Sequence, residues 1–122
     1  MDDDVRSLLD ELSGYVREPV IVEGAKDEDA LKAAGFENII RLNKGGSLLD
    51  AVESLQHLDR VVILTDLDQE GKILRKKLLK LFGPYGIHET KRPREILAQL
   101  RLSHVEGLKS LLKDEEFNQT LD

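Results

Sequence analysis

Three carboxylates in this sequence stand where short apolar runs end. Asp66 and Asp68 follow the run at residues 61–65, and Glu23 follows the run at residues 20–22. Residues two apart on an extended chain point to one side, so the aspartates should repel unless a cation lies between them. Mg²⁺ (or Mn²⁺) suits two carboxylates together with waters and substrate phosphates. A separate glutamate can transfer a proton to or from an attacking or leaving oxygen. The three residues therefore predict a phosphoryl-transfer site, with Glu23 catalytic and the aspartates as metal ligands.

Elements that alternate along the chain must position these side chains. A continuous apolar run such as residues 61–64 is typical of a parallel strand covered on both faces. Strands are expected at 20–22, 38–42, 61–64 and 85–90, and helices between them at 26–34, 48–57 and 69–82. This order predicts a compact, Rossmann-like α/β fold of about four mostly parallel strands, because strand-helix alternation makes right-handed crossovers. The strand carrying Asp66 should lie beside the strand carrying Glu23, since only neighbours could share one phosphate.

Additional helices are expected at both ends. Apolar residues at helical spacing over 4–16 indicate an N-terminal packing helix. The Pro93 region should open a short helix, and Ser103 to Glu106 fits a capping box for a last helix over about 104–113, with a fraying tail beyond. We expect three parts: residues 1–18 as the packing helix, 19–91 as the core, and 92–122 as a C-terminal helical extension.

Charge is unevenly distributed. The formal net charge is −6, yet residues 70–101 hold nine of the 18 Lys and Arg against three Glu. In the helix expected at 69–82, Ile73 and its apolar neighbours should face inward, while Lys72, Lys76 and Lys80 repeat every four residues on the other side. These lysines are possible phosphate contacts, or simply a solvated face.

Composition limits the remaining choices. With 122 residues the chain suits one domain. Aromatic residues make up 4%, which argues against base stacking as the mode of binding. Cysteine is absent, so thiolate metal sites and a cysteine nucleophile are excluded. No apolar run approaches the roughly 18 residues of a membrane span, and the amino end is acidic. We expect a soluble cytoplasmic protein without a membrane partner.

The stretches Glu23 to Asp27 and Thr65 to Gly71 together resemble the two signature motifs of the Toprim domain. This domain occurs in topoisomerases, bacterial-type primases, some nucleases and the ribonuclease that matures the smallest ribosomal RNA. The similarity runs from about residue 19 to residue 91 and is strongest to the small stand-alone Toprim proteins and to that ribonuclease. The chain carries none of the large flanking domains of topoisomerases and primases, so those complete activities are not implied.

The resemblance implies roles for individual residues. Glu23 is similar to the family's general acid or base, and Asp66 and Asp68 to its metal-binding pair. Asp27 matches an acidic residue of the first motif. The loop at residues 43–47, which contains Lys44 and Ser47, is similar to the loop that borders the site.

Each of these residues also has a simpler interpretation. Asp66 and Asp68 could be turn and cap residues, and Asp27 an ordinary acid in the first turn of a helix. Lys44 and Ser47 could be ordinary loop residues without a role in the site. His104 is interpreted as part of a helix start, without a catalytic role.

Two functional classes follow, both with nucleic acid as partner and RNA favoured over DNA. The first is a Toprim-type metal-dependent nuclease or phosphotransferase, a hydrolase acting most naturally on structured RNA. The alternative is a non-catalytic binding or scaffolding module that works beside a protein partner. A phosphoacceptor receiver domain would need an adjacent acidic pair after the first strand, where this chain offers Glu23 alone.

Overall fold

The computed structural model describes residues 3–42 and 46–121, and the side chains among them up to residue 114. A single four-stranded sheet lies at its centre, in the order β2-β1-β3-β4 with every neighbouring pair parallel. The strands are β1 (Val20–Val22), β2 (Ile39–Arg41), β3 (Arg60–Ile63) and β4 (His88–Glu89). The predicted α/β class, the parallel sheet and the pairing of β3 with β1 are therefore confirmed.

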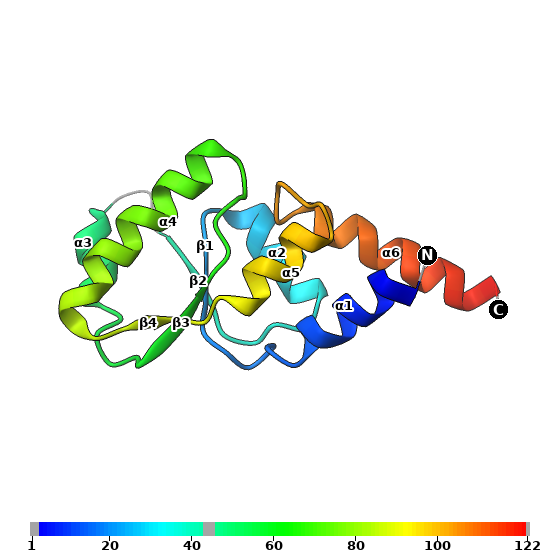
Figure 1. Ribbon diagram of the computed structural model, residues 1–122, viewed down its shortest axis with the longest axis horizontal. Helices are drawn as coiled ribbons and strands as arrows, with labels where there is room; N and C mark the ends of the chain where they lie inside the picture. The colour runs from blue at the N-terminus through cyan, green and yellow to red at the C-terminus, as the bar shows by residue number, and fades with distance from the viewer. Residues whose placement is uncertain (1–2, 43–45, 122) are drawn as a thin grey trace.

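Helices cover both faces of the sheet (Figure 1). One face carries α3 (Leu48–Glu53) and α4 (Gln69–Phe82). The other carries α1 (Asp3–Ser13), α2 (Ala25–Ala33), α5 (Arg92–Gln99) and α6 (Gly107–Leu121), and the start of α1 and the end of α6 lie at the same end of the molecule. No helix in the described residues is both long and apolar enough to cross a membrane.

The central strand β1 and residues 61–63 of β3 are entirely apolar because each face of the sheet has its own core. Val20, Val22, Val62 and Leu64 pack with helices α1, α2, α5 and α6. The alternate strand residues Ile21, Val61 and Ile63 pack with α3 and α4. All seven are fully buried. Burial on both faces removes the apolar-polar alternation of a half-exposed strand.

Several boundaries differ from those expected. Helix α3 ends at Glu53 rather than near residue 57, and β4 is limited to two residues because Gly83–Tyr85 forms a 3₁₀ turn, η1. Ile73 is 44% exposed, not inward-facing. The buried stripe of α4 includes Gly71, Leu78 and Phe82. Ile73 lies two residues, or about 200°, from Gly71 and so falls on the opposite side.

The last helix also begins elsewhere than predicted. It starts at Gly107 and continues to Leu121, so the expected bounds at about residues 104 and 113 are both wrong. Ser103 and Val105 instead hydrogen-bond to the loop that follows β3, through Leu67 N to Ser103 O at 2.8 Å and Val105 N to Asp66 Oδ1 at 3.1 Å. These bonds hold the segment as a turn, and the helix forms only after it.

Gly71 is the point where α4 meets the end of β3. A Cβ on Gly71 would lie 1.8 Å from the backbone oxygen of Asp66 and 2.5 Å from its carbonyl carbon. Because these are backbone atoms of a buried turn, no side-chain rotation can relieve such a clash. We predict that Gly71→Ala destabilises the protein by about 3 kcal/mol or more.

Urea unfolding followed by circular dichroism measures this change. Gly83→Ala is the matched control, since a Cβ there meets nothing within 4 Å and the backbone has an ordinary φ of −50°. It should change the free energy of unfolding by less than about 1 kcal/mol. Equal effects of the two substitutions would contradict the close approach of α4 to β3.

Candidate metal centre

The ends of β1 and β3 bring Glu23 against Asp66. Glu23 Oε1 accepts a hydrogen bond of 2.9 Å from the backbone N–H of Asp66. The contact arises because β1 and β3 are parallel neighbours, with Ile21 paired to Ile63. Two residues beyond that pair the strands deliver Glu23 and Thr65, and the next residue is Asp66. The Glu23 carboxylate thus contacts the backbone of the loop that carries Asp66 and Asp68.

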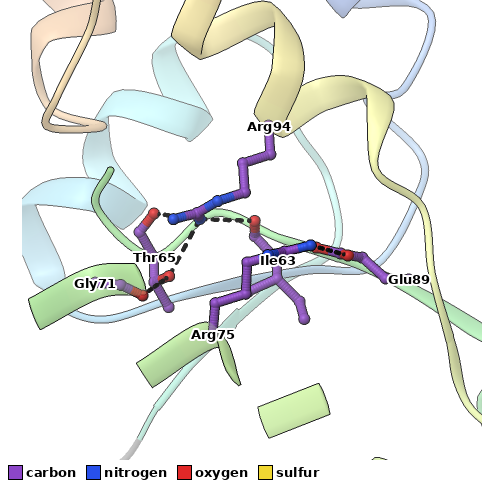
Figure 2. Close-up of polar contacts among 6 residues, drawn as sticks. All are labelled: Ile63, Thr65, Gly71, Arg75, Glu89 and Arg94. Carbon is purple, nitrogen blue, oxygen red and sulfur yellow. Dashed lines mark hydrogen bonds and ion pairs between the residues drawn. The ribbon is translucent and has the colours of Figure 1, made fainter. Parts of the chain in front are cut away.

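The loop after β3 is held by Arg94, whose side chain extends from α5 to Thr65 and Ile63 (Figure 2). Arg94 Nη1 donates to Thr65 O at 2.6 Å and to Thr65 Oγ1 at 3.1 Å, and Nη2 donates to Asp66 O at 2.9 Å. Thr65 is fully buried, and its hydroxyl donates in turn to Gly71 O at 2.7 Å. Arg94 therefore satisfies the carbonyl groups at the end of β3 and fixes the backbone on which both aspartates stand.

Sequence reasoning missed Arg94, although a signal was available. Lys91, Arg92 and Arg94 stand at or within the first turn of α5, where positive charge opposes the helix dipole. Such cations need partners. Arg92 is paired with Glu11 of α1 and Glu95, and Arg94 reaches the β3 carbonyls. Burial lowers the pKa of Arg94, with repulsion from Arg75 as a second cause.

Each aspartate uses one oxygen in the fold. Asp66 Oδ1 accepts from Val105 N at 3.1 Å. Asp68 is the N-cap of α4, and its Oδ1 accepts from Gly71 N at 2.8 Å. The cap interpretation of Asp68 is therefore correct for one of its oxygens, while Oδ2 lies 3.4 Å from His104 Nε2.

These three side chains could hold a metal ion. One ligand atom from each of Asp66, Asp68 and His104 lies within 4.8 Å of the others. Two carboxylate oxygens and one imidazole nitrogen are an ordinary donor set for a divalent cation. His104 was assigned to a helix start from the sequence, and it joins this group because the 103–105 segment is a turn docked on the Asp66 loop. Glu23 is not a member of the group that the described residues form.

Burial and neighbouring carboxylates raise the pKa of Glu23. Burial is the larger cause, and the negative charges of Asp66, Asp27 and Asp68 add to it, against a lowering by the Asp66 N–H bond. A raised pKa means that the folded state keeps this proton to a higher pH than the unfolded chain does. In the metal-free protein, protonation of Glu23 therefore stabilises the folded state. This contribution to the free energy of unfolding is complete below the ordinary pKa of 4.5 and is lost as the pH rises through the folded-state pKa.

Asp27 has a structural role. It is buried at 9% exposure, and its Oδ2 accepts from the backbone N–H of Gly24 at 3.1 Å, which closes the entry of the chain into α2. Burial, followed by repulsion from Asp66, raises its pKa. Asp27 therefore fixes the turn directly after Glu23, which supports the site without requiring contact with a ligand.

The remaining predicted residues are less involved. Ser47 is the N-cap of α3 and accepts from Asp50 N at 3.0 Å. Lys44 lies outside the described residues. Lys72, Lys76 and Lys80 are exposed on α4 and form no ion pair with any described residue.

Comparison with known proteins identifies the family of this chain. The Toprim domain family model matches residues 18–98, which is well over half of the chain. The chain therefore belongs to the Toprim domain family. Toprim domains typically bind a divalent metal, and membership associates the chain with metal-dependent functions on nucleic acid.

Within that family its relatives are UPF0292 proteins. The one from Methanosarcina acetivorans is 34% identical over 110 residues, covering 88% of this chain and 76% of the relative. The one from Pyrococcus horikoshii is 36% identical over 96 residues, covering 75% and 72%. A solved structure of a putative protein from Aquifex aeolicus has a TM-score of 0.74 at 28% identity, covering 87% of this chain and 99% of that one.

The double use of Asp68 allows its cap and its proposed metal contact to be separated. Asparagine is as good an N-cap as aspartate, whereas alanine is not. In chelator, Asp68→Ala should lose about 1 kcal/mol of stability, while Asp68→Asn should stay near wild type because it also relieves repulsion among the carboxylates. Both should lose most of the rise in melting temperature that Mg²⁺ or Mn²⁺ gives the wild type.

Thermal melting with each ion and with chelator is the measurement. Asp50→Asn is the control, since Asp50 is an exposed acid of α3 that belongs to no candidate ligand group in the described residues. It should keep the full metal response. If millimolar divalent ion does not change the melting temperature of the wild type, Asp68 is a helix cap and not a metal ligand.

Proposed function

We propose that this protein is a divalent-metal-dependent phosphodiesterase that cleaves nucleic acid, with structured RNA as its substrate. The observation that carries the proposal is the meeting of Glu23 with the Asp66 loop at the carboxyl edge of two adjacent parallel strands. Ligands of open parallel sheets bind at this edge. The choice of RNA rests on the similarity of both motifs to those of the ribosomal-RNA-maturing ribonuclease.

The carboxylates divide into two roles. Asp66 and Asp68 would hold the ion, since each keeps one oxygen that its backbone hydrogen bond does not use. A bound divalent ion supplies charge neutralisation on the phosphate and polarises its oxygens. Glu23 would transfer the proton. The pKa of Glu23 is raised toward neutral pH, and a group whose pKa is near the working pH can both accept and return a proton.

Arg94 and Gly71 position these groups without touching substrate. Arg94 holds the carbonyls of Thr65 and Asp66, so the Asp66 carboxylate leaves a fixed backbone. Gly71 allows the first turn of α4 to approach Asp66 closely, which places Asp68 as its cap. The ligand atoms are therefore placed by buried structure rather than by a free loop.

Positive charge available for the substrate is found on α4. Within residues 70–101, three arginines are engaged internally: Arg75 with Glu89, Arg92 with Glu11, and Arg94 with β3. Lys72, Lys76 and Lys80 remain exposed. Eight residues of helix separate Lys72 from Lys80, about 12 Å, so the row begins near Asp68 and leads away from it along α4.

The central test is cleavage by the purified chain. Structured RNA hairpins, duplex DNA and single-stranded DNA are incubated with Mg²⁺, with Mn²⁺ and with chelator. The proposal expects metal-dependent cleavage of the RNA. Metal-dependent binding without cleavage of any substrate would favour the scaffolding alternative, in which a partner protein supplies the activity.

Glu23→Gln should separate metal binding from turnover. Glutamine retains an oxygen that can accept from Asp66 N, yet it cannot carry the proton. We predict a loss of roughly 10²- to 10⁴-fold in the cleavage rate, with the metal-induced rise in melting temperature largely kept. Glu18→Gln is a control, because Glu18 pairs with Arg60 at the opposite edge of the sheet. A Glu23→Gln variant that cleaves at the wild-type rate would remove the proton-transfer role.

Charge reversal tests the α4 surface. Replacing Lys72, Lys76 and Lys80 by Glu should weaken RNA binding by about tenfold or more and reduce the dependence of log affinity on log salt by about 3. Fluorescence anisotropy over a salt series measures both effects. The control reverses Arg17, Lys32 and Arg60, which give the same change in charge near the other edge of the sheet. Equal losses in the two triple variants would mean that net charge, not the α4 surface, governs binding.

A further inference from the structure

We propose that His104 is a ligand of the metal ion and that it makes the centre prefer a first-row transition dication over Mg²⁺. This inference rests on the proposed function, and it specifies the cofactor. The family model matches residues 18–98, so His104 lies beyond the part of the chain that the Toprim model describes. The preference would be a property that the C-terminal segment adds to the Toprim core.

The segment that carries His104 is anchored on the Asp66 loop at both of its sides. Ser103 O accepts from Leu67 N at 2.8 Å, and Val105 N donates to Asp66 Oδ1 at 3.1 Å. The Val105 side chain is fully buried in the core with Leu108. His104 thus lies between two anchored residues, and one of its ring nitrogens is within 4.8 Å of an oxygen of each aspartate.

The imidazole is oriented for binding a cation. Its Nδ1 lies 3.1 Å from Ser103 Oγ, and its Nε2 lies 3.4 Å from Asp68 Oδ2. Metal-binding histidines commonly donate the N–H of one ring nitrogen to a neighbouring acceptor, which leaves the lone pair of the other nitrogen for the ion. Ser103 can serve as that acceptor, so that Nε2 turns its lone pair toward the aspartate oxygens.

The donor set determines which ions fit. Mg²⁺ favours oxygen ligands and retains several waters. An imidazole nitrogen raises affinity along the series of first-row transition ions, where Co²⁺ binds more tightly than Mn²⁺. Two carboxylates with one imidazole should therefore bind Co²⁺ most tightly, Mn²⁺ next and Mg²⁺ least. His104 remains half exposed, which leaves the other coordination positions open to water or a phosphate.

The competing explanation is a simple ion pair. A protonated His104 beside Asp68 would give the same 3.4 Å contact with no metal involved. In that case removing the imidazole frees Asp68, and the affinity for each of the three ions either stays at its wild-type value or rises by the same factor. If His104 is a ligand, removing it lowers the Co²⁺ and Mn²⁺ affinities much more than the Mg²⁺ affinity.

Calorimetric titration of the full chain with Co²⁺, Mn²⁺ and Mg²⁺ separates the two. We expect His104→Ala to weaken Co²⁺ and Mn²⁺ binding by about tenfold or more and Mg²⁺ binding by less than about threefold. The visible absorption of bound Co²⁺ should change as a nitrogen ligand is lost. His57→Ala, at an exposed histidine after α3, is the matched control and should leave both readouts unchanged.

Two further variants sharpen the result. Ser103→Ala should produce a smaller change of the same kind, because it removes the acceptor that orients the ring. His104→Asp should make an all-oxygen site, with the preference for Co²⁺ over Mg²⁺ reduced. Thermal melting in chelator establishes that each variant is folded. We expect folded variants because the His104 side chain is half exposed.

The outcomes distinguish this inference from the proposed function. Ion ratios that His104→Ala leaves unchanged would overturn the role of His104 while leaving a metal-dependent phosphodiesterase intact. Failure of the wild type to bind any of the three ions would overturn both.

Discussion

The carboxyl end of β3 is the point on which the structure depends, because it must be deeply buried and still present polar backbone to its surroundings. Unpaired carbonyl groups in such a place are costly. Arg94 removes that cost by donating to Thr65 O and Asp66 O, and the Thr65 hydroxyl binds the first turn of α4. With the guanidinium from one face and α4 from the other, the loop after β3 has little freedom. The candidate site is therefore built on a turn that is bonded from both faces of the sheet.

The acidic residues at this turn serve fold and site together. Asp68 caps α4, Asp66 receives the 103–105 segment, and Asp27 closes the turn after Glu23. Backbone N–H donors thus orient the carboxylates of Asp66 and Asp68, and each carboxylate keeps one oxygen that its backbone hydrogen bond does not use. The interpretations of these aspartates as caps and as ligands are compatible, because a carboxylate has two oxygens.

Lysine and arginine are used differently in the basic part of the chain. Arg75, Arg92 and Arg94 all bond to other groups of the chain. The Arg75–Glu89 pair is largely covered, with Glu89 at 3% exposure, whereas the Arg92–Glu11 pair lies at the surface. The planar guanidinium suits such multiple, directed bonds. The lysines of α4 stay in solvent, where a flexible ammonium can follow a phosphate backbone. A count of positive charge along the sequence does not separate these two uses, since it ignores whether each charge already has an internal partner.

The sequence by itself determined the class of fold, the pairing of β1 with β3, and the position of Glu23 beside the loop that follows β3. It could do so because apolar runs ending in acids and glycines encode local structure, and parallel crossovers place strand ends at one edge. The tertiary structure alone decided the contacts of Arg94 and His104. Arg94 stands 28 residues from the Asp66 carbonyl it binds, and His104 lies 36 residues from Asp68. Such contacts depend on how helices pack across the sheet, and side-chain spacing along the chain carries no record of that packing.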